Sequence, residues 1–303
     1  MIVNTNTRGL FLIVLILFFQ SCFIHETKSK VEEVAFNGMT RTFESEYASF
    51  SPEDILGLYV VNRPEASVPG TLKPAGNLFD NLRLRLDGET MKPLNPAFYP
   101  AGIHRVDLYA YGPYVSEGLA EGNVLSFSVR REQSTPEALK QSDLLWGRLL
   151  EVETSQRRPP QVIFEHQLSK IRISLKAGIG VTLHSPIVLI EGTKPSVQLN
   201  LADGELGEAT GTITPVTPLR SVGENVYQAI VIPQTVGMSN RLFTVTNDGK
   251  IYHYVLKADR HFQKGTVYTY DITIHADDLE VELSGIINDW IPGDYDTQEY
   301  DYT

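Results

Sequence analysis

Apolar residues alternate with polar residues along many short stretches of this 303-residue chain. A period of two is typical of β-strands that turn one face to a core and the other to solvent. Turn residues separate the stretches, and the alternation predicts strands over residues 82–87, 106–111, 125–130, 171–176, 197–201, 241–246, 250–256, 266–274 and 279–287. Many short strands joined by Gly, Pro and Asn turns predict antiparallel β-sandwiches.

One short helix is expected among these strands. The hydroxyl of Thr135 can cap a helix, and Pro136 suits the first helical position, where its missing N–H would have no intrahelical partner. Glu137 complements the positive end of the helix dipole. These signals predict a helix over residues 136–141.

The N-terminus carries the features of an export signal. Arg8 precedes an unbroken run of apolar residues, 10–19, which is too short for a permanent membrane-spanning helix of about 20 residues. Ser21 and then Cys22 follow, so the one cysteine of the chain stands directly after a small residue. This arrangement resembles the lipobox of bacterial lipoproteins, which implies signal cleavage between Ser21 and Cys22 and acylation of the Cys22 thiol. The alternatives are an ordinary signal peptide with an incidental cysteine, or a buried N-terminal strand.

A proline-rich segment predicts where the mature chain divides. Pro159 and Pro160 exclude a helix and a central strand, and the preceding Arg157 and Arg158 keep the segment hydrated. The expected organisation has three parts: a lipoprotein signal peptide over 1–21, an N-terminal β-sandwich domain with its tether over 22–158, and a C-terminal β-sandwich domain with an acidic tail over 159–303.

Charge and motif content exclude several classes of protein. The formal net charge of −11 argues against a nucleic-acid-binding protein, which needs a basic face. One cysteine allows no intrachain disulfide and no cysteine-based metal cluster. The sequence lacks nucleophile-elbow, zinc-protease, phosphate-loop and EF-hand motifs, and no two of its histidines have the helical i, i+4 spacing. We therefore expect no enzyme activity, no catalytic residue, no metal site and no cofactor; the alternative is that His253, His261 and His275 converge across strands.

Two groups of tyrosines stand out. Tyr109 and Tyr111 share one face of a predicted strand, so they form either a platform that stacks on a sugar ligand or part of an inter-sheet core, and the core is favoured. Tyr295, Tyr300 and Tyr302 lie in an acidic C-terminal tail, which has little need of aromatic residues for solubility. This tail is a candidate donor strand that docks in a groove of this molecule or of a neighbour.

Several local sequences, in the same order, are typical of one known family. They are FFQSC (18–22), DILGLYVV (54–61), FYPAGIHRVDLYAYGPY (98–114), QSDLLWG (141–147), FEHQLSKIRISLKAG (164–178), AIVIPQTV (229–236), GTVYTYDITI (265–274) and GIINDWIPGD (285–294). On these segments the chain resembles the fimbrillin family, which comprises fimbrial-subunit and adhesin-like surface lipoproteins of Bacteroidales-type Gram-negative bacteria.

The resemblance implies both a fold and a function. The implied fold is all-β, with two tandem transthyretin-like (Greek-key) antiparallel β-sandwich domains. The implied function is that of a non-enzymatic fimbrial structural or accessory subunit in cell adhesion. Such a subunit is exported as a lipoprotein, is held at the outer membrane and cell surface by its lipid anchor, and forms a homo- or hetero-polymer with other fimbrial subunits.

The resemblance also implies how subunits assemble. A surface Arg-specific protease removes the N-terminal segment with its first strand, and Arg41 is the candidate cleavage site here. A missing strand exposes an apolar groove and unpaired backbone groups, and a strand donated by another subunit satisfies both. The alternative function is that of a glycan-binding surface lipoprotein that does not polymerise; a host protein or glycan is a possible further partner in either case.

Overall fold

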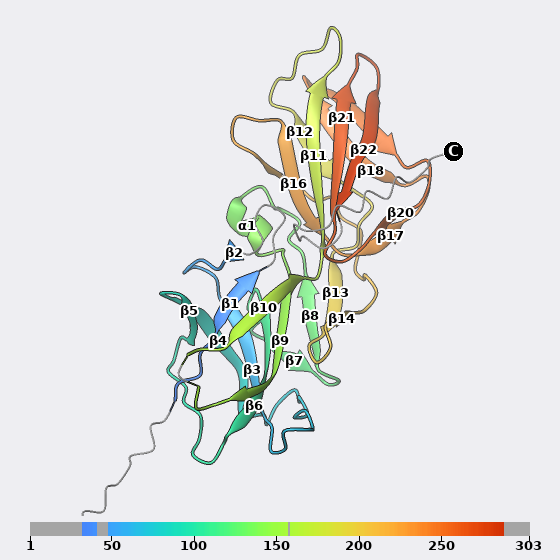
Figure 1. The fold of residues 1–303 in the computed structure, drawn as a ribbon. Helices are drawn as coiled ribbons and strands as arrows, with labels where there is room; N and C mark the ends of the chain where they lie inside the picture. Colours follow the sequence, from blue (N-terminus) through green and yellow to red (C-terminus); the bar gives the residue numbers. More distant parts are fainter. Residues whose placement is uncertain (1–31, 41–47, 157, 288–303) are drawn as a thin grey trace, which may run out of the picture. The chain divides into compact units, whose positions relative to one another are not determined.

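The computed structural model describes residues 32–40, 48–156 and 158–287, and these ranges form an all-β fold with one short helix (Figure 1). The strands belong to five sheets. The helix, α1 (Pro136–Lys140), begins at the predicted residue, and the Thr135 hydroxyl accepts a hydrogen bond from the backbone N–H of Ala138 at 3.1 Å. None of the described residues forms a helix that is long and apolar enough to cross a membrane.

The largest sheet has eight strands in the order β2-β1-β10-β9-β6-β3-β4-β5. Their bounds are β1 (Asn37–Thr40), β2 (Ala48–Ser49), β3 (Leu56–Asn62), β4 (Phe79–Asp87), β5 (Thr90–Pro93), β6 (Arg105–Gly112), β9 (Leu145–Glu153) and β10 (Gln161–His166). A four-stranded sheet has the order β14-β13-β8-β7. It consists of β7 (Leu119–Ala120), β8 (Val124–Ser128), β13 (Ser196–Asn200) and β14 (Glu205–Leu206).

The remaining three sheets are formed by later parts of the chain. A five-stranded sheet has the order β15-β16-β11-β21-β22. It contains β11 (Ser169–Ala177), β15 (Leu219–Arg220), β16 (Val226–Val231), β21 (Val267–Ile274) and β22 (Leu279–Ile287). Three strands form the sheet β12-β18-β19, and β17 pairs with β20. Their bounds are β12 (Ile187–Ile190), β17 (Gln234–Val236), β18 (Arg241–Asn247), β19 (Lys250–Val255) and β20 (Arg260–Phe262).

Three clusters of buried side chains form the core. One lies between the five-stranded and three-stranded sheets and includes Ile173, Phe243 and Tyr270. The other two cover opposite faces of the strands β3 and β6. Leu58 and Leu108 belong to one of them, whereas Tyr59, Tyr109 and Tyr111 belong to the other, together with residues of the four-stranded sheet.

The predicted alternation is confirmed in most segments, but β6 differs from the expectation. Every residue from Val106 to Gly112 is buried, so neither face of this strand meets solvent. The reason is its place in the middle of the eight-stranded sheet, where a core cluster covers each face.

The pairing is largely antiparallel, as predicted, with two exceptions. β1 is parallel to β10, and β11 is parallel to β21 from Lys170 to Ala177 (Figure 1). Parallel neighbours cannot be joined by a tight hairpin, and each of these pairs is indeed separated by a long stretch of sequence. Alternation within a strand carries no information on such partners.

Strands from both sides of Pro159 share sheets. β10 pairs with β9, and β13 pairs along its length with β8. The described residues accordingly belong to one compact unit. The division of the mature chain into two domains at residues 158 and 159 stays a prediction.

Candidate functional site

The first described residues of the chain, 32–40, form an N-terminal segment that is hydrogen-bonded on two sides. On one side the N–H of Val34 donates to the carbonyl of Ala97 at 2.8 Å, and Phe36 exchanges two hydrogen bonds with Met91, at 2.7 and 3.2 Å. On the other side β1 runs parallel to β10, beside which it lies in Figure 1. The N-terminal segment thus bridges β5 and β10, which are distant in the order of the sheet.

The side chains of this segment enter the core. Val34 is 1% exposed and Phe36 is 0% exposed. The ring of Phe36 lies 6.1 Å from that of Phe164 on β10, and Phe50 contacts Phe164 edge-on at 5.1 Å between centroids. Burial of each such side chain contributes about 1.5–3 kcal/mol. The N-terminal segment therefore fills a groove that would be apolar and short of backbone partners without it.

Most of the predicted site residues lie outside the described ranges. These are the predicted lipidation site Cys22 with the preceding Ser21, the candidate processing site Arg41, and the tail tyrosines Tyr295, Tyr300 and Tyr302. Their roles stay predictions.

Tyr109 and Tyr111 are core residues in this structure. Their exposed fractions are 4% and 0%. The Tyr111 hydroxyl donates to Oδ1 of Asn81 at 2.6 Å and accepts from the N–H of Val115 at 3.3 Å. Burial raises the pKa of both tyrosines. A platform for a sugar requires an exposed aromatic face, so the pair offers no such platform here, and the favoured interpretation as core describes it.

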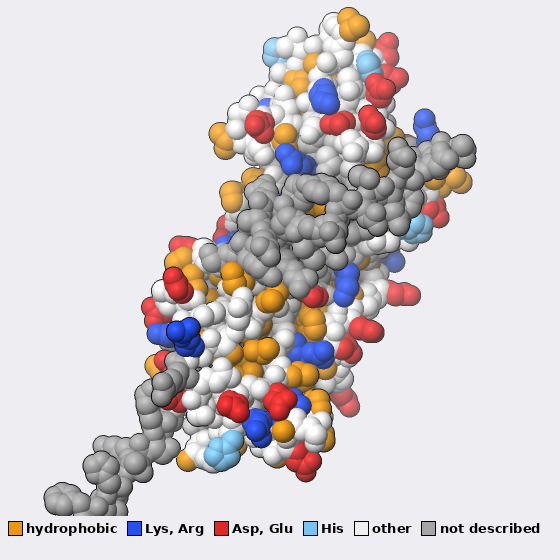
Figure 2. All heavy atoms as spheres, in the orientation of Figure 1, with side chains coloured by type: hydrophobic (Ala, Val, Ile, Leu, Met, Phe, Trp, Pro, Cys, Tyr) orange, Lys and Arg blue, Asp and Glu red, His pale blue; other side chains and the backbone are white. Residues whose placement is uncertain are grey.

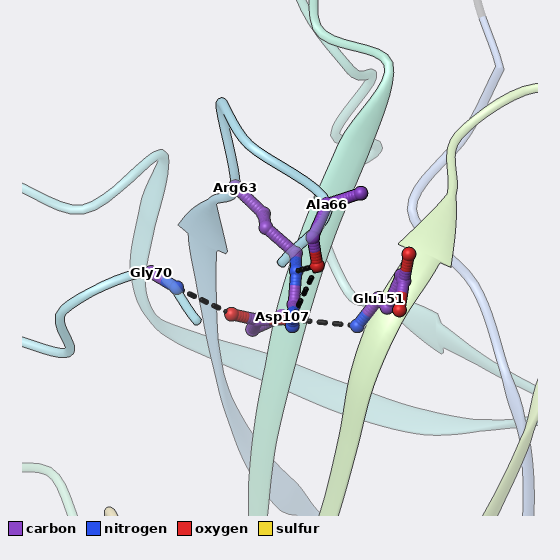
Figure 3. Close-up of polar contacts among 5 residues, drawn as sticks. All are labelled: Arg63, Ala66, Gly70, Asp107 and Glu151. Atoms are coloured by element: carbon purple, nitrogen blue, oxygen red, sulfur yellow. Dashed lines mark hydrogen bonds and ion pairs between the residues drawn. The ribbon is translucent and has the colours of Figure 1, made fainter. Parts of the chain in front are cut away.

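Asp107 is a buried charged residue, and the alternation pattern did not indicate its burial. Its carboxylate is 0% exposed and pairs with the Arg63 guanidinium at 2.8 Å (Figure 3). It also accepts from the backbone N–H of Gly70 at 2.6 Å and from that of Glu151 at 2.8 Å. The remaining Arg63 nitrogens donate to the carbonyl of Ala66 at 3.0 and 2.7 Å.

The position of Asp107 explains why a carboxylate is needed there. The β6–β9 ladder is irregular between Val106 and Leu108, and Glu151 on the opposite strand has a φ of 60°. This bulge leaves the N–H of Glu151 without a ladder partner, and the Asp107 carboxylate accepts it. The same carboxylate ties loop 63–70 to the sheet, so the network is structural. An Asp on the same strand face as two buried tyrosines was the one signal in the sequence that could have revealed it.

The histidines considered as a metal site are separately engaged. His253 contacts the hydroxyl of Thr244 at 2.9 Å, His261 contacts that of Thr235 at 2.7 Å, and His275 lies 3.2 Å from the carboxylate of Glu280. Within the described ranges, no three His, Cys, Asp or Glu side chains are placed to hold a metal ion. The visible face of the molecule mixes acidic and basic side chains (Figure 2).

Solved structures of other proteins have a fold similar to that of this chain. Two crystal structures described as candidate cell adhesion proteins are similar to this chain. The one from Bacteroides ovatus has a TM-score of 0.67 at 20% identity and covers 87% of this chain and 99% of its own. The one from Bacteroides uniformis has a TM-score of 0.64 at 22% identity and covers 85% of this chain and 98% of its own.

A tip fimbrial protein is also similar in fold. The structure of Mfa3 from Porphyromonas gingivalis, truncated at its C-terminus, has a TM-score of 0.50 at 11% identity and covers 84% of this chain and 99% of its own. No curated protein sequence matches the chain. The family model described as "Fimbrillin-like" matches residues 40–290, which is most of the sequence. The chain therefore belongs to the fimbrillin-like family.

Proposed function

We propose that this protein is a fimbrial structural or accessory subunit that acts in cell adhesion at the cell surface. Its family is one of structural fimbrial and adhesion proteins rather than enzymes. Fimbrial proteins associate with other subunits, and we propose the same for this chain. The finer fold that accompanies this proposal is a pair of transthyretin-like sandwiches, with β10 contributed to the first.

The observation that carries the proposal is the buried N-terminal segment. Val34 and Phe36 fill a groove in the core, and backbone hydrogen bonds hold the segment to Met91 and Ala97. Cleavage after Arg41 would release the whole segment because β1 ends at Thr40, one residue earlier. The vacated groove would then accept a strand of similar pattern from another subunit, which satisfies the same backbone groups.

We also propose a donor strand and a membrane anchor. The donor strand is the C-terminal tail with Tyr295, Tyr300 and Tyr302, which follows the last described strand, β22. The anchor is an acyl group on Cys22. A single such chain binds membranes only marginally, so stable anchoring requires more than one acyl group.

Strand donation is tested with two forms of the chain. One begins at residue 22, with Cys22→Ser to avoid acylation, and the other begins at Thr42. We expect only the shorter form to give SDS-resistant ladders on gels without heating. Monomers from both forms would contradict strand donation, and ladders that persist after deletion of residues 288–303 would exclude the tail as donor.

A peptide provides the matched control. A synthetic peptide of residues 32–41 should fill the groove of the shorter form and suppress the ladder. The same peptide with Phe36→Asp should not, because a carboxylate cannot be buried beside Phe164 without a partner. Labelling with radioactive palmitate in a Gram-negative host tests the anchor, and label should be lost in Cys22→Ser.

A further inference from the structure

A cavity of about 770 Å³ adjoins the core that the N-terminal segment enters, since Phe50 lines the cavity and packs on Phe164 beside Phe36. It lies beside the start of β3 and the ends of β6 and β10, and residues of α1 and β8 also line it. Its walls include Leu56, Tyr114, Phe127 and Leu145. The volume is within the range of about 300–1,000 Å³ that is usual for sites of small ligands. These walls belong to strands or adjoin them, so the cavity is largely formed before any ligand arrives.

The polar residues of the cavity are of both signs. Acidic and basic side chains line it in nearly equal number: Glu53, Asp54, Glu137, Asp143, Arg83, Arg130 and Lys140. A phosphate or a polyanion would meet several carboxylates here, and a cation would meet several basic groups. A neutral ligand that both donates and accepts hydrogen bonds fits such a mixture better than either.

Two of the carboxylates are held in place by neighbours. Asp54 accepts from the backbone N–H of Ser51 at 2.7 Å and pairs with the Lys140 ammonium at 2.6 Å. Asp143 lies 2.8 Å from Nδ1 of His166, whose side chain is 7% exposed. Fixed carboxylates lose little conformational entropy when they bind a ligand.

An aromatic ring completes the cavity. Tyr114 is half-buried in its wall, and the Arg83 guanidinium lies over the ring, 5.1 Å from its centroid. The guanidinium stacks on the ring and keeps its orientation. Apolar C–H groups of a ligand can pack on the exposed part of the Tyr114 ring, while hydroxyl groups reach the rim.

We propose that this cavity binds a neutral saccharide of about two rings. Sugar hydroxyl groups donate and accept at once, which matches a rim of fixed carboxylates, guanidinium groups and the Gln141 amide, and sugar rings present apolar C–H faces to an aromatic side chain. The inference deepens the proposed adhesive function by naming a ligand class, and it places that ligand away from the buried Tyr109 and Tyr111.

Binding is tested on the chain from residue 22 with Cys22→Ser. Saturation-transfer NMR with lactose, maltose, cellobiose and chitobiose, each at millimolar concentration, should show transfer to at least one of them. Tyr114→Ala and Asp143→Asn should each weaken that binding about tenfold, as expected for the loss of one good contact. Tyr114→Phe keeps the ring and should bind within about threefold of the parent.

The controls separate binding from folding and from assembly. Glu165→Gln changes an exposed acid on β10 outside the cavity and should leave binding unchanged. Thermal unfolding checks each variant, and Gln141→Ala, which removes a cavity amide without touching the core, should also weaken binding. The SDS ladder of the form beginning at Thr42 should be the same in all variants, so failure of this inference is distinct from failure of strand donation.

Two NMR results would overturn the proposed saccharide binding. Absence of saturation transfer from all four disaccharides overturns it. So does binding that Tyr114→Ala, Asp143→Asn and Gln141→Ala leave at the parental affinity. Transfer to tetra-alanine without transfer to any disaccharide would replace the saccharide by a peptide.

Discussion

The ring of Tyr111 lies directly over Gly57 on the neighbouring strand. The two residues are paired in register between β3 and β6, and a Cβ atom at residue 57 would stand 2.2 Å from Cε1 of the tyrosine ring. An aromatic ring that covers a strand glycine compensates for the missing side chain. The packing of Tyr111 in the core therefore depends on the absence of a side chain at residue 57.

Gly57→Ala should destabilise the protein. The added methyl group must displace the ring of a fully buried tyrosine, and overpacking of this kind costs about 1–3 kcal/mol. Urea denaturation followed by fluorescence measures the free energy of unfolding. Gly285→Ala on β22 is the matched control because its Cβ would meet nothing closer than 3.7 Å. Equal stabilities of the two variants would contradict the overlap.

Asp107→Ala should be among the most damaging single substitutions in the first sheet. It leaves the Arg63 guanidinium and the N–H groups of Gly70 and Glu151 without their acceptor, and removal of one partner of a buried ion pair costs about 3–5 kcal/mol. Chemical denaturation provides the measurement. The exposed pair of Lys92 and Asp87 is the comparison, and Asp87→Ala should change stability little.

The stability of the fold should fall at alkaline pH, in part through Tyr99. Burial raises the pKa of Tyr99 to about 12, above the value of about 10 for a free tyrosine. At a pH between these two pKa values, Tyr99 releases its phenolic proton in the unfolded chain and retains it in the folded chain. The free energy of unfolding therefore falls as pH rises. This difference in pKa corresponds to a loss of at most about 3 kcal/mol in the free energy of unfolding.

Tyr99→Phe tests this cause. The variant has no phenolic proton to release at residue 99. Its free energy of unfolding should therefore fall less between pH 9 and pH 11.5 than that of the parent. Urea denaturation at both pH values gives the comparison. Parallel declines in parent and variant would show that Tyr99 does not contribute.

Phe36→Ala should destabilise the protein and loosen the N-terminal segment. Phe36 is fully buried against Phe164, and truncation of a buried Phe costs about 3–5 kcal/mol. Hydrogen exchange at Met91, whose N–H donates to the carbonyl of Phe36 at 2.7 Å, should accelerate in the variant. Phe98→Ala is the matched control, since Phe98 is 48% exposed, and it should cost much less.

Much of the local structure was predictable because it depends on local geometry. The hairpin of β18 and β19 follows from two alternating segments around Asn247, Asp248 and Gly249, and α1 follows from its capping residue Thr135. Alternation also placed Tyr109 and Tyr111 on one strand face, as the structure confirms. Family membership was likewise predictable, since its segments are spread along the chain.

The candidate site was only partly predictable. Val34 and Phe36 stand in a short apolar stretch before Arg41, but nothing in the sequence shows that their partners are Ala97 and Met91. Pairing between residues so distant depends on the whole set of long-range contacts, which a local pattern does not encode. The same holds for Asp107, whose role depends on a bulge in the opposite strand.

The sequence by itself determined which side chains share a strand face, because successive residues of a strand point to opposite sides. It also determined the turns, the helix cap and the family. Only the tertiary structure decided which faces are covered. Tyr109 and Tyr111 are core residues because residues of β13, far along the chain, close over them, and burial of that second face is a property of two sheets packed together rather than of either strand.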